Sequence, residues 1–145
     1  MSHLLHPPLL DELGLAGAVQ DYAAGFAARS GIRASVHVAE DWPRLPREME
    51  LALFRVVQES LANVHRHSGS PTATIRLLCE DEALRVEVAD AGRGLGDALS
   101  SAGDRPLGVG IAGMKERLRQ LGGELEMESG PGGTTVRAVL PRVNG

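Results

Sequence analysis

A row of polar side chains in one expected helix is the first group in this sequence that could do chemistry. Glu59 and Asn63 share a helical face, because side chains four residues apart lie one above the other. Arg66 continues that face one turn later, with His67 beside it. A carboxylate, an amide oxygen and a cation in a row suit a Mg²⁺–phosphate group, since Mg²⁺ takes few protein oxygens and keeps several waters. A solvated polar face is the alternative, although Asn is a poor helix former, which favours a functional interpretation.

A second group stands where an apolar, alternating segment ends. Asp90 is followed by Gly92 and Gly94 at the start of a long glycine-rich stretch. An Asp at the carboxyl end of a strand points into the crevice where open sheets bind ligands, and nearby glycines let a flat ligand approach the backbone. Asp and Gly are also common in ordinary turns, so this motif is weak on its own.

The third group runs from Gly108 to Gly113 and matches the GxGxxG pattern of dinucleotide-binding folds. That fingerprint must follow a strand, whereas residues 100–106 are rich in Ser, Gly and Pro, so we reject it. A phosphate loop fails too, because Met114 separates Gly113 from Lys115 and no Ser or Thr follows. Two interpretations remain: a glycine-rich helix N-terminus whose free N–H groups can hold a phosphate, or a tight turn that only opens a helix.

The fourth group, Gly133 and Thr134, ends a Gly-Pro-Gly-Gly run that begins at residue 130. By itself this run predicts the turn of a β-hairpin. Only its combination with the other three groups gives it a functional interpretation.

These four groups need helices and strands to position them. Apolar residues that recur at three- and four-residue intervals indicate helices, and alternating or turn-bounded apolar runs indicate strands. The three expected helices cover residues 14–30, 47–67 and 111–121. The five expected strands cover residues 32–38, 72–80, 83–89, 124–129 and 134–140. Because the last four strands come in adjacent pairs, the order favours an α+β fold with helices on one face of a mixed sheet over a doubly wound parallel sheet.

Two segments do not fit these elements. Residues 1–13 contain a Pro-Pro pair and predict an extended lead-in, because Pro removes donors and stiffens the chain. Residues 90–107 are rich in Gly and too long for an ordinary connection, so we expect a functional lid there.

Composition narrows the class of protein. The chain has 145 residues, of which 43% are apolar and 23% charged, values typical of one globular domain with a full core. A net charge of −4 and only 3% aromatic residues argue against a nucleic-acid binder. The single cysteine, Cys79, excludes an internal disulfide framework and a thiolate zinc site. Neither a signal peptide nor a run of about 18 apolar residues is present, so we expect a soluble protein of a reducing compartment.

In this order, the four groups resemble the N, G1, G2 and G3 boxes of the GHKL ATPase superfamily, which comprises gyrase-like ATPases, Hsp90, histidine kinases and MutL. Within it, residues 58–68 resemble the N box of sensor histidine kinases that pair with LuxR/NarL-type response regulators. Residues 110–117 and 139–141 fit the same subfamily. Residues 5–15 are similar to the segment that joins the dimerisation helices to the ATP-binding domain. The resemblance therefore spans nearly the whole chain.

The resemblance implies the Bergerat fold, a two-layer α/β sandwich with three helices on one face of a mixed, mostly antiparallel sheet. It also implies ATP and Mg²⁺ as cofactors. Asp90 would accept the adenine amine, with Gly92, Gly94 and Thr134 completing the base pocket through water. The implied nucleotide-binding residues are Asn63, Arg66, His67, Asp90, Gly92, Gly94, Gly108, Val109, Gly110, Ile111 and Thr134. The implied metal ligands are Asn63 and Glu59.

The resemblance also assigns chemistry and shows departures. Glu59 stands at the position that acts as a base in the superfamily's hydrolases; in kinases this residue orients the accepting imidazole or the metal. Arg66 replaces the usual Lys, which keeps the charge but changes its geometry. Pro131 lies three residues before Thr134, whereas four is commoner. The expected ATP lid covers residues 91–109, and its Gly108 and Gly110 would let the backbone close on the phosphates.

The implied function is to bind Mg²⁺·ATP and donate the γ-phosphoryl group to a histidine on a separate dimerisation domain, in two-component signalling. None of the chain's five histidines precedes an acidic residue, as the family's phosphoacceptor does. We therefore expect residues 1–13 to be a linker from a missing dimerisation domain and residues 14–145 to be the ATP-binding domain. The implied partners are that domain and a LuxR/NarL-type response regulator, with no nucleic acid. The chain alone would be a cytoplasmic monomer, within a homodimeric parent that is or is not membrane-anchored.

Three other functions stay open at this point. A hydrolase like gyrase or MutL shares the four boxes but takes a phosphate-sensing Lys from a following domain. A serine kinase that acts as an anti-sigma factor shares the fold, and so does a regulatory module that binds nucleotide without catalysis. A turn-rich domain without a nucleotide site is the remaining alternative.

Overall fold

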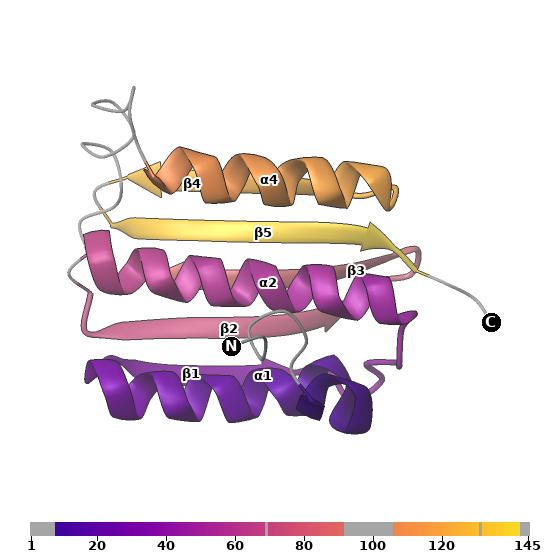
Figure 1. The fold of residues 1–145 in the computed structure, drawn as a ribbon, viewed down its shortest axis with the longest axis horizontal. Helices are drawn as coiled ribbons and strands as arrows, with labels where there is room; N and C mark the ends of the chain where they lie inside the picture. Colours follow the sequence, from indigo (N-terminus) through magenta and orange to yellow (C-terminus); the bar gives the residue numbers. More distant parts are fainter. Residues whose placement is uncertain (1–7, 69, 92–105, 131, 143–145) are drawn as a thin grey trace.

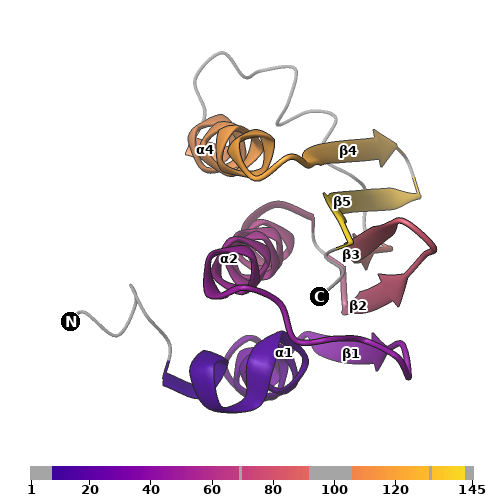
Figure 2. The ribbon, with the colours of Figure 1, turned by 90° about the vertical axis from the view of Figure 1, so that its right-hand side faces the viewer.

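The chain folds into two layers, one of helices and one of strands. A computed structural model describes residues 8–68, 70–91, 106–130 and 132–142. Within these residues, the helices are α1 (Pro8–Ser30), α2 (Arg47–Asn63), the π-helical turn η2 (Val64–Ser68) and α4 (Pro106–Gln120). The strands are β1 (Arg33–Val38), β2 (Thr72–Cys79), β3 (Ala83–Asp90), β4 (Glu124–Gly130) and β5 (Gly133–Pro141). Figures 1 and 2 show all three α-helices on the same face of the sheet, as the α+β interpretation predicts.

The strand order is β1-β2-β3-β5-β4. β1 pairs with β2 in parallel, and every other pair is antiparallel, which confirms the mixed and mostly antiparallel sheet. Because β3 and β5 are antiparallel neighbours, the end of β3 lies beside the start of β5. The topology thus places Asp90, of the second sequence group, beside Gly133 and Thr134, of the fourth, at one end of the two strands.

Helix α2 lies across the middle of the sheet, between α1 and α4 (Figure 1). It is buried over most of its circumference, because it packs on the strands beneath and on a helix at each side. Its ring of Phe54 meets Tyr22 of α1 edge to face, with 5.6 Å between centroids. The core residues that face α2 from the central strands are Leu84, Val86, Val88, Val136, Ala138 and Leu140. Burial of a Val or Leu side chain stabilises the fold by about 1.5–3 kcal/mol, so this packing contributes strongly to holding the helix layer on the sheet.

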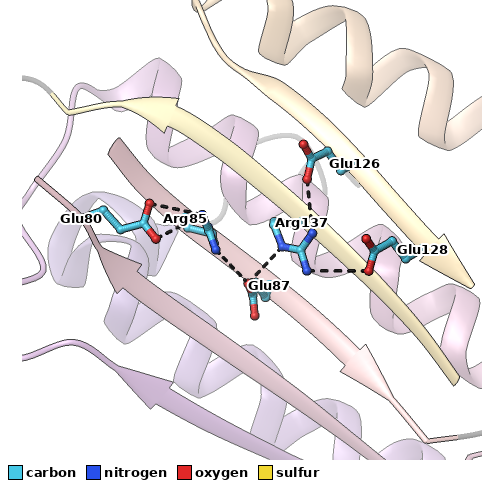
Figure 3. Close-up of polar contacts among 6 residues, drawn as sticks. All are labelled: Glu80, Arg85, Glu87, Glu126, Glu128 and Arg137. Carbon is cyan, nitrogen blue, oxygen red and sulfur yellow. Dashed lines mark hydrogen bonds and ion pairs between the residues drawn. The ribbon is translucent and has the colours of Figure 1, made fainter. Parts of the chain in front are cut away.

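The sheet face away from the helices carries a charged network (Figure 3). Arg137 on β5 lies between Glu87 on β3, at 3.1 Å, and Glu126 on β4, at 3.2 Å. These hydrogen bonds raise the pKa of Arg137 above its usual value. The other members of the network are Glu80, Arg85 and Glu128. Partly exposed pairs of this kind contribute little each, but here they link side chains of β3, β4 and β5 across the sheet.

Two helix starts differ from the predictions. The extended lead-in is wrong for residues 8–13, which form the first turns of α1. Leu10 is fully buried, so docking of its side chain in the core stabilises these turns, and Pro is well suited to the first position of a helix. Gly14, with φ 76° and ψ −178°, then interrupts the helix where it was expected to begin.

Helix α4 likewise begins at Pro106 rather than at residue 111, so residues 106–109 of the expected lid are helical. Residues 92–105 lie outside the described residues. The strand predictions are confirmed to within one or two residues at each end. Within the described residues, no helix combines the length and the hydropathy needed to cross a membrane.

Candidate functional site

The site lies where the end of α2 passes over the end of β3 and the start of β5. A small chamber of about 10 Å³ is enclosed there. Its lining residues come from α2, η2, β3 and β5, and they are Ser60, Asn63, Val64, Val88, Asp90, Thr134 and Val136. The structure thus brings together three of the predicted site residues, Asn63, Asp90 and Thr134, from segments far apart in the chain.

The sheet register positions Asp90. It is the last residue of β3, one position beyond the Ala89–Thr135 pair with β5. Gly133 has φ +134°, and a Cβ there would collide with the carbonyl oxygen of Asp90. Only glycine therefore lets the start of β5 lie this close to Asp90.

Asn63 is 3% exposed, so this part of the polar row is not a solvated face. Among the described residues its Nδ2 has no hydrogen-bond partner, and neither has the buried Oγ of Ser60 one turn earlier. A buried polar group without a partner costs about 1–3 kcal/mol, and such groups call for an explanation. Both atoms lie in residues that line the same chamber, so a ligand that enters it would satisfy them.

The cation of the polar row, Arg66, contacts the two other polar side chains. The Arg66 guanidinium donates to Asn63 Oδ1 at 3.1 Å and to Glu59 Oε2 at 3.4 Å. These two oxygens are also the ones that a Mg²⁺ ion would take. The described residues contain no group of three His, Cys, Asp or Glu side chains able to hold a metal by themselves. The donor set suits an ion that takes its remaining ligands from phosphate and water.

A wider cleft of about 620 Å³ opens beside this site, between α2 and α4. Glu59 faces it from α2 and Gly113 from α4. Its other lining residues are Glu48, Leu51, Ala52, Arg55, Gln58, Met114 and Arg117. Glu59 is therefore accessible from the cleft, while Asn63 and Asp90 line the chamber at the sheet. A further open cleft of about 400 Å³ adjoins Asp90 on its other side, at the β4–β5 turn.

The structure does not describe the side chains of several predicted site residues. Gly92 and Gly94 lie outside the described residues. The backbone of residues 108–111, which includes Gly108, Val109, Gly110 and Ile111, is in the first turns of α4. His67 belongs to η2, and its side chain is not described.

Two notable residues, Ser60 and Glu50, are not among those predicted from the sequence. Ser60 lies one turn before Asn63 on the same helical face, a spacing that could have drawn attention to it. Glu50 is 2% exposed and accepts backbone N–H groups from Leu15 and Leu45, each at 3.3 Å. It looks in the sequence like an ordinary acidic residue in the first turn of a helix, and it lies away from the chamber.

Residues 48–144 match a family model described as "Histidine kinase-, DNA gyrase B-, and HSP90-like ATPase". The chain belongs to this family. It is 40% identical over 141 residues to the sensor histidine kinase NarS of Mycobacterium tuberculosis, covering 94% of this chain and 32% of NarS. It is 34% identical over 142 residues to the sensor histidine kinase MctS of Rhizobium johnstonii, covering 98% of this chain and 31% of MctS.

The fold agrees with this membership. The histidine kinase domain of a blue-light activated histidine kinase from Erythrobacter litoralis EL346 aligns with a TM-score of 0.72 and 26% identity. The alignment covers 88% of this chain and 60% of that domain. The chain spans about a third of the length of its curated relatives NarS and MctS. The fold is thus the helix-and-sheet sandwich of the GHKL ATPases.

Proposed function

We propose that this chain binds Mg²⁺·ATP and presents the γ-phosphoryl group to a histidine on another domain, as the catalytic part of a sensor histidine kinase. The observation that carries this proposal is the chamber between α2 and the central strands, where Asn63, Asp90 and Thr134 converge. The Asn63 Nδ2, which has no partner among the described residues, supports a ligand there, because a buried polar atom without a partner is costly.

Asp90 is the residue that would select the base. Its carboxylate accepts the amine of adenine, and Thr134 faces the same chamber from β5. A hydrogen bond to a charged acceptor contributes about 1.5–3 kcal/mol. The close approach of Gly133 to Asp90 leaves the base edge a flat backbone surface to lie against.

Asn63 and Glu59 are the residues that would hold Mg²⁺. When bound, the ion neutralises phosphate charge, which is the main requirement of phosphoryl transfer. Arg66 occupies the same two oxygens, so it must move aside for the ion. Its guanidinium would then lie near the phosphates, where a planar, bidentate donor suits phosphate oxygens. The first turns of α4, residues 108–111, would offer backbone N–H groups to the same phosphates.

Glu59 would orient the accepting imidazole or the metal rather than act as a hydrolytic base. It faces the wide cleft, from which a second domain can reach it. We propose that residues 1–13 lead from a dimerisation domain that carries the acceptor histidine, and that residues 14–145 form the ATP-binding domain. A LuxR/NarL-type response regulator would take the phosphoryl group next, within a homodimeric parent kinase, while this chain alone is monomeric.

The first test is calorimetric titration with ATP, with and without Mg²⁺, and with NADH in a parallel experiment. Saturable binding of ATP but not of NADH supports the site. In the Asp90→Asn variant, the dissociation constant for ATP should rise about tenfold to a hundredfold, because a charged acceptor becomes neutral. Unchanged affinity in that variant would show that Asp90 does not contact the base.

The second test is phosphoryl transfer. The chain is incubated with radiolabelled ATP, Mg²⁺ and the histidine-containing dimerisation domain of a related kinase. An acid-labile phosphohistidine on that domain is the expected product. Release of inorganic phosphate alone would indicate a hydrolase, and an acid-stable phosphoserine on a protein substrate would indicate a serine kinase.

A further inference from the structure

The hydroxyl group of Ser60 is the polar atom of the site that the proposed function leaves unexplained. Ser60 is 2% exposed, and its Oγ has no hydrogen-bond partner in the part of the chain that the structure describes. A serine in the middle of a helix usually returns its hydroxyl to a carbonyl of the preceding turn, but this one does not. It lines the chamber together with Asn63, whose Nδ2 is also unpartnered.

These two atoms and Asp90 have complementary chemistry. The Ser60 hydroxyl and the Asn63 amide are hydrogen-bond donors, while the Asp90 carboxylate only accepts and has room for several hydrogen bonds. A group that satisfies all three must accept from the helix side and donate to the strand side. Water does both, and the chamber volume of about 10 Å³ matches the space that one water molecule needs.

The orientation of the nucleotide follows from Asn63. In the proposed function, Asn63 Oδ1 reaches the metal at the phosphates while Nδ2 faces the chamber. The five-membered ring of adenine, which carries the ribose and phosphates, therefore faces α2, and the acceptor atom of that ring beside the exocyclic amine is N7. The exocyclic amine next to N7 is then directed to Asp90.

We propose, on the basis of the proposed function, that Ser60 is a base-recognition residue of the nucleotide site. Its hydroxyl donates to one water molecule in the chamber, which also accepts from Asn63 Nδ2 and donates to the Asp90 carboxylate and to adenine N7. This arrangement gives the water four partners and leaves no polar atom of the chamber unsatisfied. Ser60 thereby makes ATP affinity depend on N7, an atom that Asp90 does not contact.

The test is a cycle of one substitution and one altered nucleotide. Calorimetric titrations with ATP and with 7-deaza-ATP, in which a C–H group replaces N7, are made on the parent chain and on Ser60→Ala. The dissociation constant of the parent should be about 2- to 12-fold higher for 7-deaza-ATP than for ATP, the equivalent of one neutral hydrogen bond. Ser60→Ala should weaken ATP binding by a similar factor and leave 7-deaza-ATP binding unchanged.

Two controls accompany the cycle. Ser35→Ala, on the exposed face of β1, removes a hydroxyl far from the chamber and should change neither titration. The thermal midpoint of Ser60→Ala without nucleotide should stay close to that of the parent, because the lost hydroxyl bonds no other group among the described residues. A purely structural role for Ser60 would instead lower that midpoint.

The outcomes separate this inference from the proposed function. If the parent binds neither nucleotide, the proposed function itself is wrong. If the parent binds ATP and Ser60→Ala binds it equally well, only the role of Ser60 is wrong. The role is also overturned if Ser60→Ala weakens both nucleotides alike, or if the parent does not distinguish them.

Discussion

We expect the buried carboxylate of Glu50 to make a large contribution to the stability of the fold. Its carboxylate accepts the buried backbone N–H groups of Leu15 and Leu45, each at 3.3 Å, and the Arg44 Nε at 3.2 Å. It therefore caps the main segment of α1, which restarts after the break at Gly14, and it fastens the loop before α2. One side chain thus holds three segments together.

The Glu50→Ala substitution removes that acceptor and leaves two buried N–H groups without a partner. Each such group costs about 1–3 kcal/mol. Arg44 is half exposed and can return to water, so it adds little to the loss. We expect the free energy of unfolding to fall by about 3–5 kcal/mol, a large part of the roughly 5–15 kcal/mol available to a domain.

Urea denaturation followed by circular dichroism measures this loss. Glu48→Ala, at an exposed position in the same helical turn, is the matched control and should change stability by less than about 0.5 kcal/mol. Glu50→Gln keeps the shape and one acceptor oxygen, so its loss should lie between the two. If Glu50→Ala is no less stable than Glu48→Ala, the buried Glu50 carboxylate does not stabilise the contact between these segments.

Three further predictions concern the site and the sheet. Asn63→Ala should abolish most of the Mg²⁺ dependence of ATP binding, because it removes a proposed metal ligand; titrations that still differ with and without the ion as in the parent would contradict this. Gly133→Ala should lower the free energy of unfolding by about 1–3 kcal/mol or more, since a side chain there is strained and collides with Asp90, whereas Gly132→Ala, in open space, is the control in the same urea series. Partial burial and the nearby Asp41 raise the pKa of the Cys79 thiol above its usual 9.0, so its contribution to stability is complete below that pH and is lost as the pH rises through the raised value. Urea titrations between about pH 8 and pH 10.5 should therefore show a smaller decline in Cys79→Ser than in the parent, and equal declines would refute the linkage.

The sequence predicts most of the fold because its elements are locally consistent. The long apolar periodicity of residues 47–67 predicts a helix in spite of the polar row on it. The short turns between paired strands fix the register of each hairpin. The observed starts of α1 and α4 differ from the predicted ones because Pro and Gly near a helix end favour a break by local pattern alone. In α1, burial of Leu10 stabilises helical turns on the N-terminal side of the break at Gly14. Local sequence pattern cannot predict this, because the burial depends on residues distant in the chain.

The site is predictable only in part, for a related reason. Asn63 stands out because Asn is a poor helix former, whereas Asp90 and Thr134 are predicted only from their combination and order with the other groups. Ser60 and Glu50 are ordinary in a helix, and only tertiary packing leaves one without a partner and gives the other two backbone donors. Burial, rather than residue type, gives both their significance.

Helix α2 connects two parts of the molecule. Glu50 near its start holds the N-terminal helix, and Asn63 at its end faces the nucleotide chamber, about 20 Å away at a rise of about 1.5 Å per residue. The same helix therefore carries, near its two ends, the carboxylate that accepts from Leu15, the first residue after the break at Gly14, and the amide that lines the chamber. The main segment of α1 and the chamber are thus joined by one continuous element of the fold.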